Sequence, residues 1–180
     1  EPGKSKWDEI DPMSRPVRFT ASNGGSIARR GAKEGGAVGG WLKNGSGRVF
    51  GFSNNHVIAA LNQGRQNDSI WHAGTQIGNL HSWIRLEPPP AQNRMDLALF
   101  ALSEGEPWRW RHPRPVGWME PKVNQLVYRV DRSGNLRKGI ITTIGRTLVV
   151  PFGARSFEFK DIIAIRPTGP GPFSSPGDSG

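Results

Sequence analysis

The sequence contains no cysteine and only one tyrosine among its 180 residues. Without cysteine, the chain has no disulfide bonds, no thiol catalysis and no cysteine-ligated metal centre. No run of about 18 apolar residues occurs, which excludes a membrane-spanning helix and argues against a membrane partner. No helix of about ten residues is indicated, and 24 glycines and 15 prolines favour short strands joined by turns. The absence of cysteine also favours a cytoplasmic location.

Acidic residues are outnumbered, because 24 lysines and arginines face 15 aspartates and glutamates, for a net charge of +9. A basic balance favours acidic partners, but an ordinary solvated basic surface is the explanation that we prefer. The segment from Trp108 to Arg114 interleaves tryptophan with arginine and could stack bases and hold phosphates. We favour a linker whose tryptophans pack while its arginines stay in water. Nucleic acid is therefore a partner that the sequence allows but does not favour.

Turn signals recur at the spacing of an all-β sandwich or barrel, and strand-like segments occur in both halves of the chain. We therefore predict two antiparallel β-barrel lobes. Their expected boundaries are an N-terminal arm over 1–16, a first lobe over 17–103, a proline-rich interlobe linker over 104–121 and a second lobe over 122–180. The expected strands are 37–42, 48–53, 70–71, 75–80 (or 75–84), 96–102, 125–130, 137–144, 147–152 and 157–165, with one short helical turn over 57–63 and an Asn-Gly hairpin over 43–47.

Three places carry residues suited to acyl-transfer chemistry: His56 after a strand, Asp96 at the head of an apolar run, and Ser179 between glycines. A serine hydroxyl is a poor nucleophile until a neighbouring imidazole takes its proton. A carboxylate holds that imidazole in the required tautomer, and backbone N–H groups around the serine can stabilise an oxyanion. Each residue alone has an ordinary structural explanation, but the three together, in this order on a two-lobed β protein, indicate catalysis.

The motifs Ser53-Asn54-Asn55-His56-Val57, Met95-Asp96-Leu97-Ala98 and Gly177-Asp178-Ser179-Gly180 resemble those of trypsin/chymotrypsin-like serine proteases. The chain is most similar to a bacterial and plant branch that carries the Ser-Asn-Asn-His-Val motif. The resemblance implies two six-stranded barrels with the site between them. It also implies that His56 is the general base and acid, Asp96 its orienting carboxylate and Ser179 the nucleophile, and that the backbone N–H groups of Gly177 and Ser179 form the oxyanion hole.

The chain also departs from that family. It has no Ile-Val-Gly-Gly-like start, so activation by inserting a new N-terminus beside Asp178 is not expected. The strands that follow the Gly-Asp-Ser-Gly motif in the family are missing, so the second barrel should be incomplete unless another segment or chain supplies them. The resemblance places Phe173, six residues before Ser179, at the floor of the specificity pocket. Because Phe173 is not acidic, we expect an apolar or small residue before the scissile bond.

The leading hypothesis is a serine endopeptidase that acts on a protein or peptide through an acyl-enzyme. The alternative is a non-enzymatic binding or regulatory module on the same fold, with a basic surface for nucleic acid or a partner protein. Further domains or a C-terminal segment of the same protein are additional candidate partners. No cofactor is expected. No metal is expected either, because the four histidines follow no zinc-binding spacing: His56, His72, His81 and His112.

Overall fold

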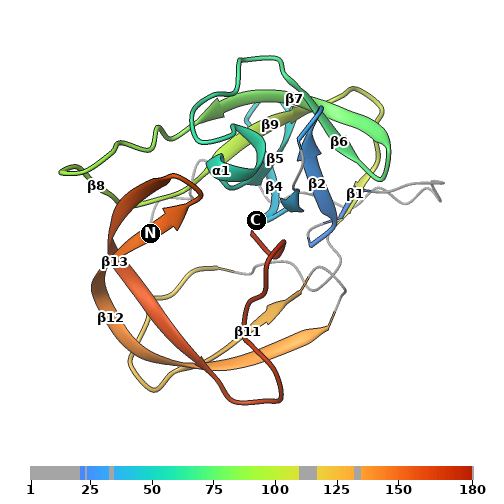
Figure 1. The fold of residues 1–180 in the computed structure, drawn as a ribbon. Coiled ribbons are helices and arrows are strands. Elements are labelled where there is room, and N and C mark those ends of the chain that lie inside the picture. The colour runs from blue at the N-terminus through green and yellow to red at the C-terminus, as the bar shows by residue number, and fades with distance from the viewer. Residues whose placement is uncertain (1–20, 23, 33–34, 110–116, 132–134, 180) are drawn as a thin grey trace.

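The computed structural model describes residues 21–22, 24–32, 35–109, 117–131 and 135–179, which form strands and one short helix (Figure 1). The predicted N-terminal arm over 1–16 lies outside the described residues. Two curled sheets dominate the structure, and the second is built from residues after 117 apart from one two-residue strand, β8 (Gln92–Asn93). The prediction of an all-β fold with two lobes is therefore confirmed, and each lobe is a curled sheet that forms a half-barrel.

The first sheet has seven strands in the order β3-β2-β6-β7-β9-β5-β4, and all neighbours are antiparallel. Its two end strands are joined by residues 38–39 alone, so the sheet curls until its ends are covalent neighbours. The strands are β2 (Ser26–Arg29), β3 (Gly36–Ala37), β4 (Gly40–Lys43), β5 (Val49–Ser53), β6 (Ser69–His72), β7 (Thr75–Trp83) and β9 (Ala98–Leu102).

The predicted Asn-Gly hairpin joins β4 to β5. The Asn44 side-chain oxygen accepts hydrogen bonds from the N–H groups of Ser46 and Arg48, at 3.2 and 2.9 Å. Such an Asx turn gives the short loop a defined path. The hairpin fixes the register of β5, the strand that leads directly to His56.

Apolar side chains from most strands of the first sheet fill its interior, and the most deeply buried are Ile27, Ile58, Ile70, Leu80 and Phe100. Gly51 leaves the space that Phe100 occupies, because a Cβ at Gly51 would lie 2.1 Å from the Phe100 ring. Burying a large apolar side chain contributes about 1.5–3 kcal/mol. This core is the rigid support on which the turn after β5 rests.

The helix α1 (Asn55–Ile58) follows β5 after one residue. It starts two residues earlier than the helical turn predicted over 57–63, and it ends at Ile58. The reason is a left-handed turn, since Ala60, Leu61 and Asn62 all have positive φ angles. A right-handed helix cannot continue through such residues.

The second sheet has four strands in the order β11-β12-β13-β8. They are β11 (Leu126–Val130), β12 (Leu136–Phe152), β13 (Arg155–Pro167) and β8 (Gln92–Asn93). The two strands expected over 137–144 and 147–152 are one long strand. The strand passes through Gly145, which has a φ of +75°. The register of its pairing with β13 shifts on either side of this glycine, and the strand continues where we expected a break.

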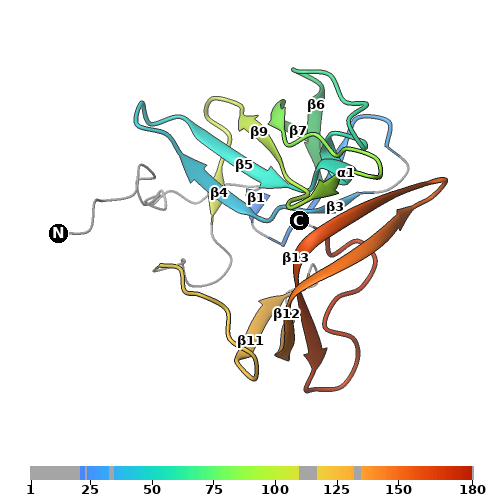
Figure 2. The ribbon, with the colours of Figure 1, turned by 90° about the vertical axis from the view of Figure 1, so that its left-hand side faces the viewer.

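The long β12–β13 hairpin joins the two sheets. It rises beside α1, as Figure 2 shows, and its strand β13 pairs in parallel with β8 from the first half of the chain. The side-chain amide of Asn93 donates to the Glu158 carbonyl oxygen at 3.1 Å. A second core cluster lies under the hairpin, with Leu86, Phe157 and Phe159 buried in it.

A parallel pair of two-residue strands, β1 (Ala21–Ser22) and β10 (Trp108–Arg109), forms a small third sheet. We expected no regular element in the proline-rich linker over 104–121, but the structure has the strand β10 there. It forms because Trp108 packs against Trp41, whose indole N–H donates to the Arg109 carbonyl oxygen at 3.1 Å. Residues 110–116 of the expected linker lie outside the described residues.

Candidate active site

His56 on α1 and Asp96, two residues before β9, contact each other at two points. The His56 Nδ1 atom hydrogen-bonds the Asp96 Oδ2 atom, and the His56 backbone N–H donates to Oδ1 at 3.2 Å. The side chains are 24% and 13% exposed. With Nδ1 on the carboxylate, Nε2 is the imidazole nitrogen left to accept a proton. The structure thus brings together two of the three residues predicted from the sequence.

The three polar residues before His56 each hold a different part of the structure. The Ser53 hydroxyl donates to the Ala37 carbonyl oxygen at 2.8 Å. The Asn54 amide donates to the Asp96 carbonyl oxygen at 2.7 Å. Asn55 is completely buried: its side-chain amide donates to the Asn62 side-chain oxygen at 2.7 Å, and its own side-chain oxygen accepts from the Asn62 backbone N–H at 3.0 Å. Each residue thus positions His56 relative to a separate neighbour.

Ser179 lies against the first sheet, beside the helix that carries His56. Its carbonyl oxygen accepts a hydrogen bond of 2.6 Å from the Ala37 N–H. A Cβ at Gly36 would lie 2.3 Å from that oxygen and 2.6 Å from a methyl of Val57, the residue after His56. The chains of the predicted nucleophile and base therefore meet at Gly36. Within the described residues, no hydrogen bond joins the Ser179 hydroxyl to His56.

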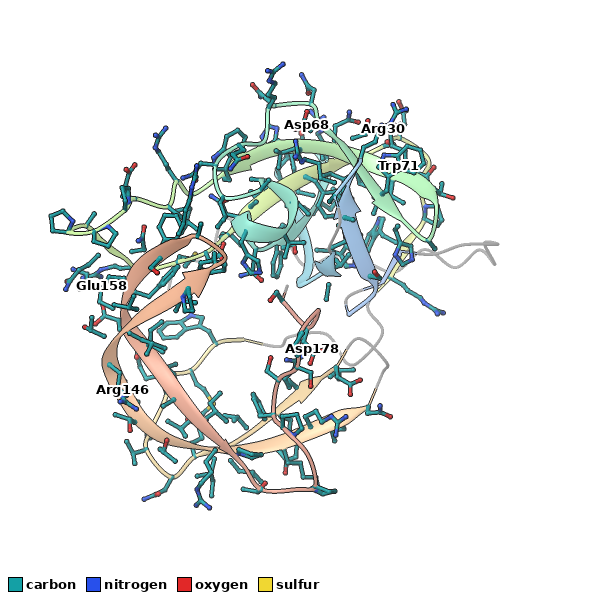
Figure 3. The ribbon with its side chains drawn as sticks, in the orientation of Figure 1. Arg30, Asp68, Trp71, Arg146, Glu158 and Asp178 are labelled. Atoms are coloured by element: carbon teal, nitrogen blue, oxygen red, sulfur yellow. The ribbon has the colours of Figure 1, made fainter. Side chains whose placement is uncertain are left out.

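The turn before Ser179 is held by an ion pair. Gly177 has a φ of +86°, in the left-handed region that favours glycine. The Asp178 carboxylate is 5% exposed and lies 3.3 Å from the Arg129 guanidinium on β11. It also accepts a 2.8 Å bond from the Ser175 N–H. Figure 3 shows Asp178 on the C-terminal segment, between the two sheets.

The backbone N–H groups of this turn are divided between two uses. The Asp178 N–H donates to the Ser175 carbonyl oxygen at 3.0 Å. In the part of the chain that the structure describes, the N–H groups of Gly177 and Ser179 donate to no protein group. These are the two donors that the family resemblance assigns to an oxyanion hole, and that assignment stays a prediction.

Phe173 is half-buried and packs on the second sheet. A Cβ at Gly139 would lie 2.9 Å from the Phe173 ring, so this glycine in β12 leaves space for it. A neighbouring cavity of about 320 Å³ is lined by residues 136–138 and 168–172, and Phe173 is not among them. The position of Phe173 at a specificity pocket therefore stays a prediction.

Phe152, at the end of β12, contacts the predicted base from the second sheet. Its ring centroid lies 5.0 Å from that of His56 and 5.9 Å from that of Phe157. The structural role of this residue was not predicted from the sequence, nor were the roles of Arg129 and the asparagines 54, 55 and 62. The Ser-Asn-Asn-His motif marked two of the asparagines, but their partners are set by tertiary contacts over 7 to 42 residues.

The other described histidines lie in separate surroundings. The Nδ1 atom of His72 is 2.6 Å from the Ser26 carbonyl oxygen, and His81 packs on Phe50. Across the described ranges, no three side chains of the metal-ligating types gather. The described part of the chain also contains no apolar helix of membrane-spanning length. His112 lies outside the described residues.

The sequence matches no protein-family model and no curated protein. The fold, in contrast, is similar to solved structures of bacterial serine proteases. Protease A of Thermobifida fusca matches with a TM-score of 0.57 and 14% identity, over 90% of this chain and 76% of that protein. A chymotrypsin of Cellulomonas bogoriensis matches with a TM-score of 0.52 and 17% identity, over 90% of this chain and 75% of that protein. The chain therefore has the fold of bacterial chymotrypsin-like serine proteases.

Proposed function

We propose that the protein is a serine endopeptidase that uses His56, Asp96 and Ser179. The observation that carries this proposal is that Asp96 holds His56 at two points, its ring Nδ1 and its backbone N–H, while the backbone of Ser179 is anchored beside the same helix. The fold shared with bacterial proteases supports it.

In the proposed reaction, the Ser179 hydroxyl attacks the peptide carbonyl carbon and passes its proton to His56 Nε2. Asp96 stabilises the imidazolium, and the N–H groups of Gly177 and Ser179 bind the oxyanion. His56 then gives the proton to the leaving amine, which departs and leaves an acyl-enzyme. A water molecule, deprotonated by His56, attacks the ester, and the serine leaves with the returned proton.

The Arg129–Asp178 ion pair supports a loop that is already set for catalysis. Asp178 is nearly buried, and a buried carboxylate is costly without a partner. Arg129 supplies that partner from within the chain and also donates to the Ser174 hydroxyl at 3.0 Å. The proposed enzyme therefore needs no newly cut N-terminus to hold its oxyanion loop.

The protein or peptide substrate is proposed to carry an apolar or small residue before the scissile bond, because Phe173 offers no negative charge. A cleavage profile dominated by lysine or arginine at that position would overturn this part.

We retain the proposed boundaries, with a first lobe over 17–103, a linker over 104–121 and a second lobe over 122–180. In the described second sheet, β11 and β8 are the two end strands.

A fluorophosphonate probe, which reacts with activated serines, tests the proposal directly. We expect covalent labelling at Ser179, lost in Ser179→Ala and retained in the control Ser82→Ala, whose serine is exposed on β7. No labelling of protein shown to be folded by circular dichroism would instead favour a non-enzymatic binding module.

A further inference from the structure

A cavity of about 470 Å³ lies between the left-handed turn after α1, the segment 85–88 and the start of β13. Its apolar residues are Leu61, Leu86 and Phe157, of which Leu86 and Phe157 are almost completely buried. Arg85, Arg155 and Gln63 are exposed residues of the same lining. The volume is in the range of binding sites for small groups, about 300–1,000 Å³. The cavity is therefore large enough for a side chain of a bound peptide.

The charged side chains that line the cavity are all positive. Its lining includes two guanidinium groups, Arg85 and Arg155, and no carboxylate among the described lining residues. Arg85 pairs with Glu87 at 2.9 Å, and both side chains of that pair are largely exposed. Arg155 forms no ion pair with any residue that the structure describes. A guanidinium binds a carboxylate through two parallel hydrogen bonds, so the lining is complementary to an acidic group.

The walls of the cavity are held in place before any ligand binds. Asn62 bridges two of them, because its side chain accepts a 2.9 Å bond from the Leu86 N–H and donates a 2.7 Å bond to the Leu86 carbonyl oxygen. The left-handed conformation of Ala60, Leu61 and Asn62 is unfavourable for residues with a Cβ. Such strain persists only where surrounding contacts impose it, and it is typical of functional sites.

The cavity lies within reach of a peptide bound at the proposed catalytic residues. Two successive ring contacts, of 5.0 and 5.9 Å, lead from His56 through Phe152 to Phe157 in the cavity lining. An extended peptide rises about 3.3 Å per residue. Three or four residues are therefore enough to span from the reacting carbonyl to the cavity.

We propose that this cavity is a subsite for an acidic side chain of the substrate, three or four residues from the scissile bond. The proposal rests on the proposed protease function. Leu61, Leu86 and Phe157 contact the methylene groups of an aspartate or glutamate, while Arg85 and Arg155 bind its carboxylate. The enzyme then selects its substrate at two separated positions, an apolar or small residue at the scissile bond and an acidic residue further away.

Peptide binding to Ser179→Ala tests the subsite without turnover. Fluorescein-labelled decapeptides carry either glutamate or glutamine at one position, which is moved along the peptide, and binding is measured by anisotropy. At one position we expect the glutamate peptide to bind about five- to tenfold more tightly. In the background of Ser179→Ala, the double change Arg85→Gln and Arg155→Gln should abolish that preference. Arg155→Lys should retain part of it.

Arg146→Gln is the matched control, because Arg146 is an exposed arginine of β12 that does not line the cavity (Figure 3). In the Ser179→Ala background, Arg146→Gln should leave the preference for the glutamate peptide unchanged. Equal binding of glutamate and glutamine peptides at every position, or a preference that survives the double change, would overturn the subsite. Failure of fluorophosphonate labelling would overturn the protease function instead, and because anisotropy needs no active serine, the two failures are distinguishable.

Discussion

The two sheets of this protein differ in how much of their apolar surface they bury. The seven-stranded first sheet encloses a continuous core built from most of its strands and from α1. The four-stranded second sheet has a small core of Leu86, Phe157 and Phe159, and Leu86 belongs to the first half of the chain. Among the residues that the structure describes, ten of the twelve exposed large apolar residues lie between residues 118 and 163, in the second half.

This difference indicates that the first sheet can support itself, whereas the second depends on contacts outside itself. The proposed site combines both kinds of support. His56 and Asp96 rest on the buried core of the first sheet, whereas Asp178 is held by Arg129 of the second. The hydrogen bond from Ala37 to Ser179 is one point at which the two parts of the site are joined.

The largest expected effect comes from a change in the first core. Phe100 is completely buried, so Phe100→Ala should lower the free energy of unfolding by about 3–5 kcal/mol through lost burial and the resulting cavity. Ile163→Ala in the second sheet should cost about 1 kcal/mol or less, because Ile163 is 40% exposed. Urea unfolding measures both. Equal losses would show that the second sheet buries more than this structure indicates.

A smaller effect, on the labelling rate at Ser179, is expected where Phe152 of the second sheet contacts His56, the proposed general base. Phe152→Ala removes a ring 5.0 Å from that of His56, and Phe50→Ala removes a ring at the same distance from His81. A ring contact contributes about 0.5–1.5 kcal/mol, so the labelling rate at Ser179 should fall up to about tenfold in Phe152→Ala. It should stay near that of the parent in Phe50→Ala and recover in part in Phe152→Leu. Equal rates in the two alanine variants would show that the second sheet does not position His56.

The smallest expected effect is an acid-dependent loss of stability that both halves share. The backbone N–H of Arg65, aided by the Arg29 guanidinium, holds the pKa of Asp68 below its usual value. The backbone N–H of Asn135, aided by Arg137, does the same for the pKa of Asp131. Figure 3 shows Asp68 on the first half of the structure.

A carboxylate with a lowered pKa stabilises the fold above its unfolded-state pKa, and the stabilisation is lost as pH falls through the folded-state pKa. The urea midpoint of the parent should therefore decline below about pH 4. Asp68→Asn and Asp131→Asn should each decline less steeply. A variant with the same acid-dependent loss as the parent would show that its carboxylate is not responsible.

Local patterns predicted much of the fold correctly. Asn44 followed by glycine indicated the hairpin between β4 and β5, and the apolar run before Leu102 indicated the buried strand β9. His56 and Asp96 were recognised as a pair from the motifs around them, and the structure places them in contact. These features depend on neighbours in the sequence or on strongly marked residue types.

Other features depend on contacts between distant segments and could not be predicted in this way. The two-residue strand β8 has no pattern of its own and is defined by its pairing with β13. We expected a break between strands at residues 145–146. β12 is continuous there because it pairs with β13 on both sides of the break. The position of Arg129 beside Asp178 follows from how β11 and the C-terminal segment pack together, which no local spacing encodes.

Gly36 has a consequence for how closely the proposed nucleophile and base can be held. The carbonyl oxygen of Ser179 and the methyl groups of Val57 occupy the volume that any side chain at this position would need. Even one methyl group there would act as a wedge, which would push the C-terminal segment away from the helix that carries His56. The segment of Ser179 and the helix of His56 can therefore approach this closely only because residue 36 has no side chain.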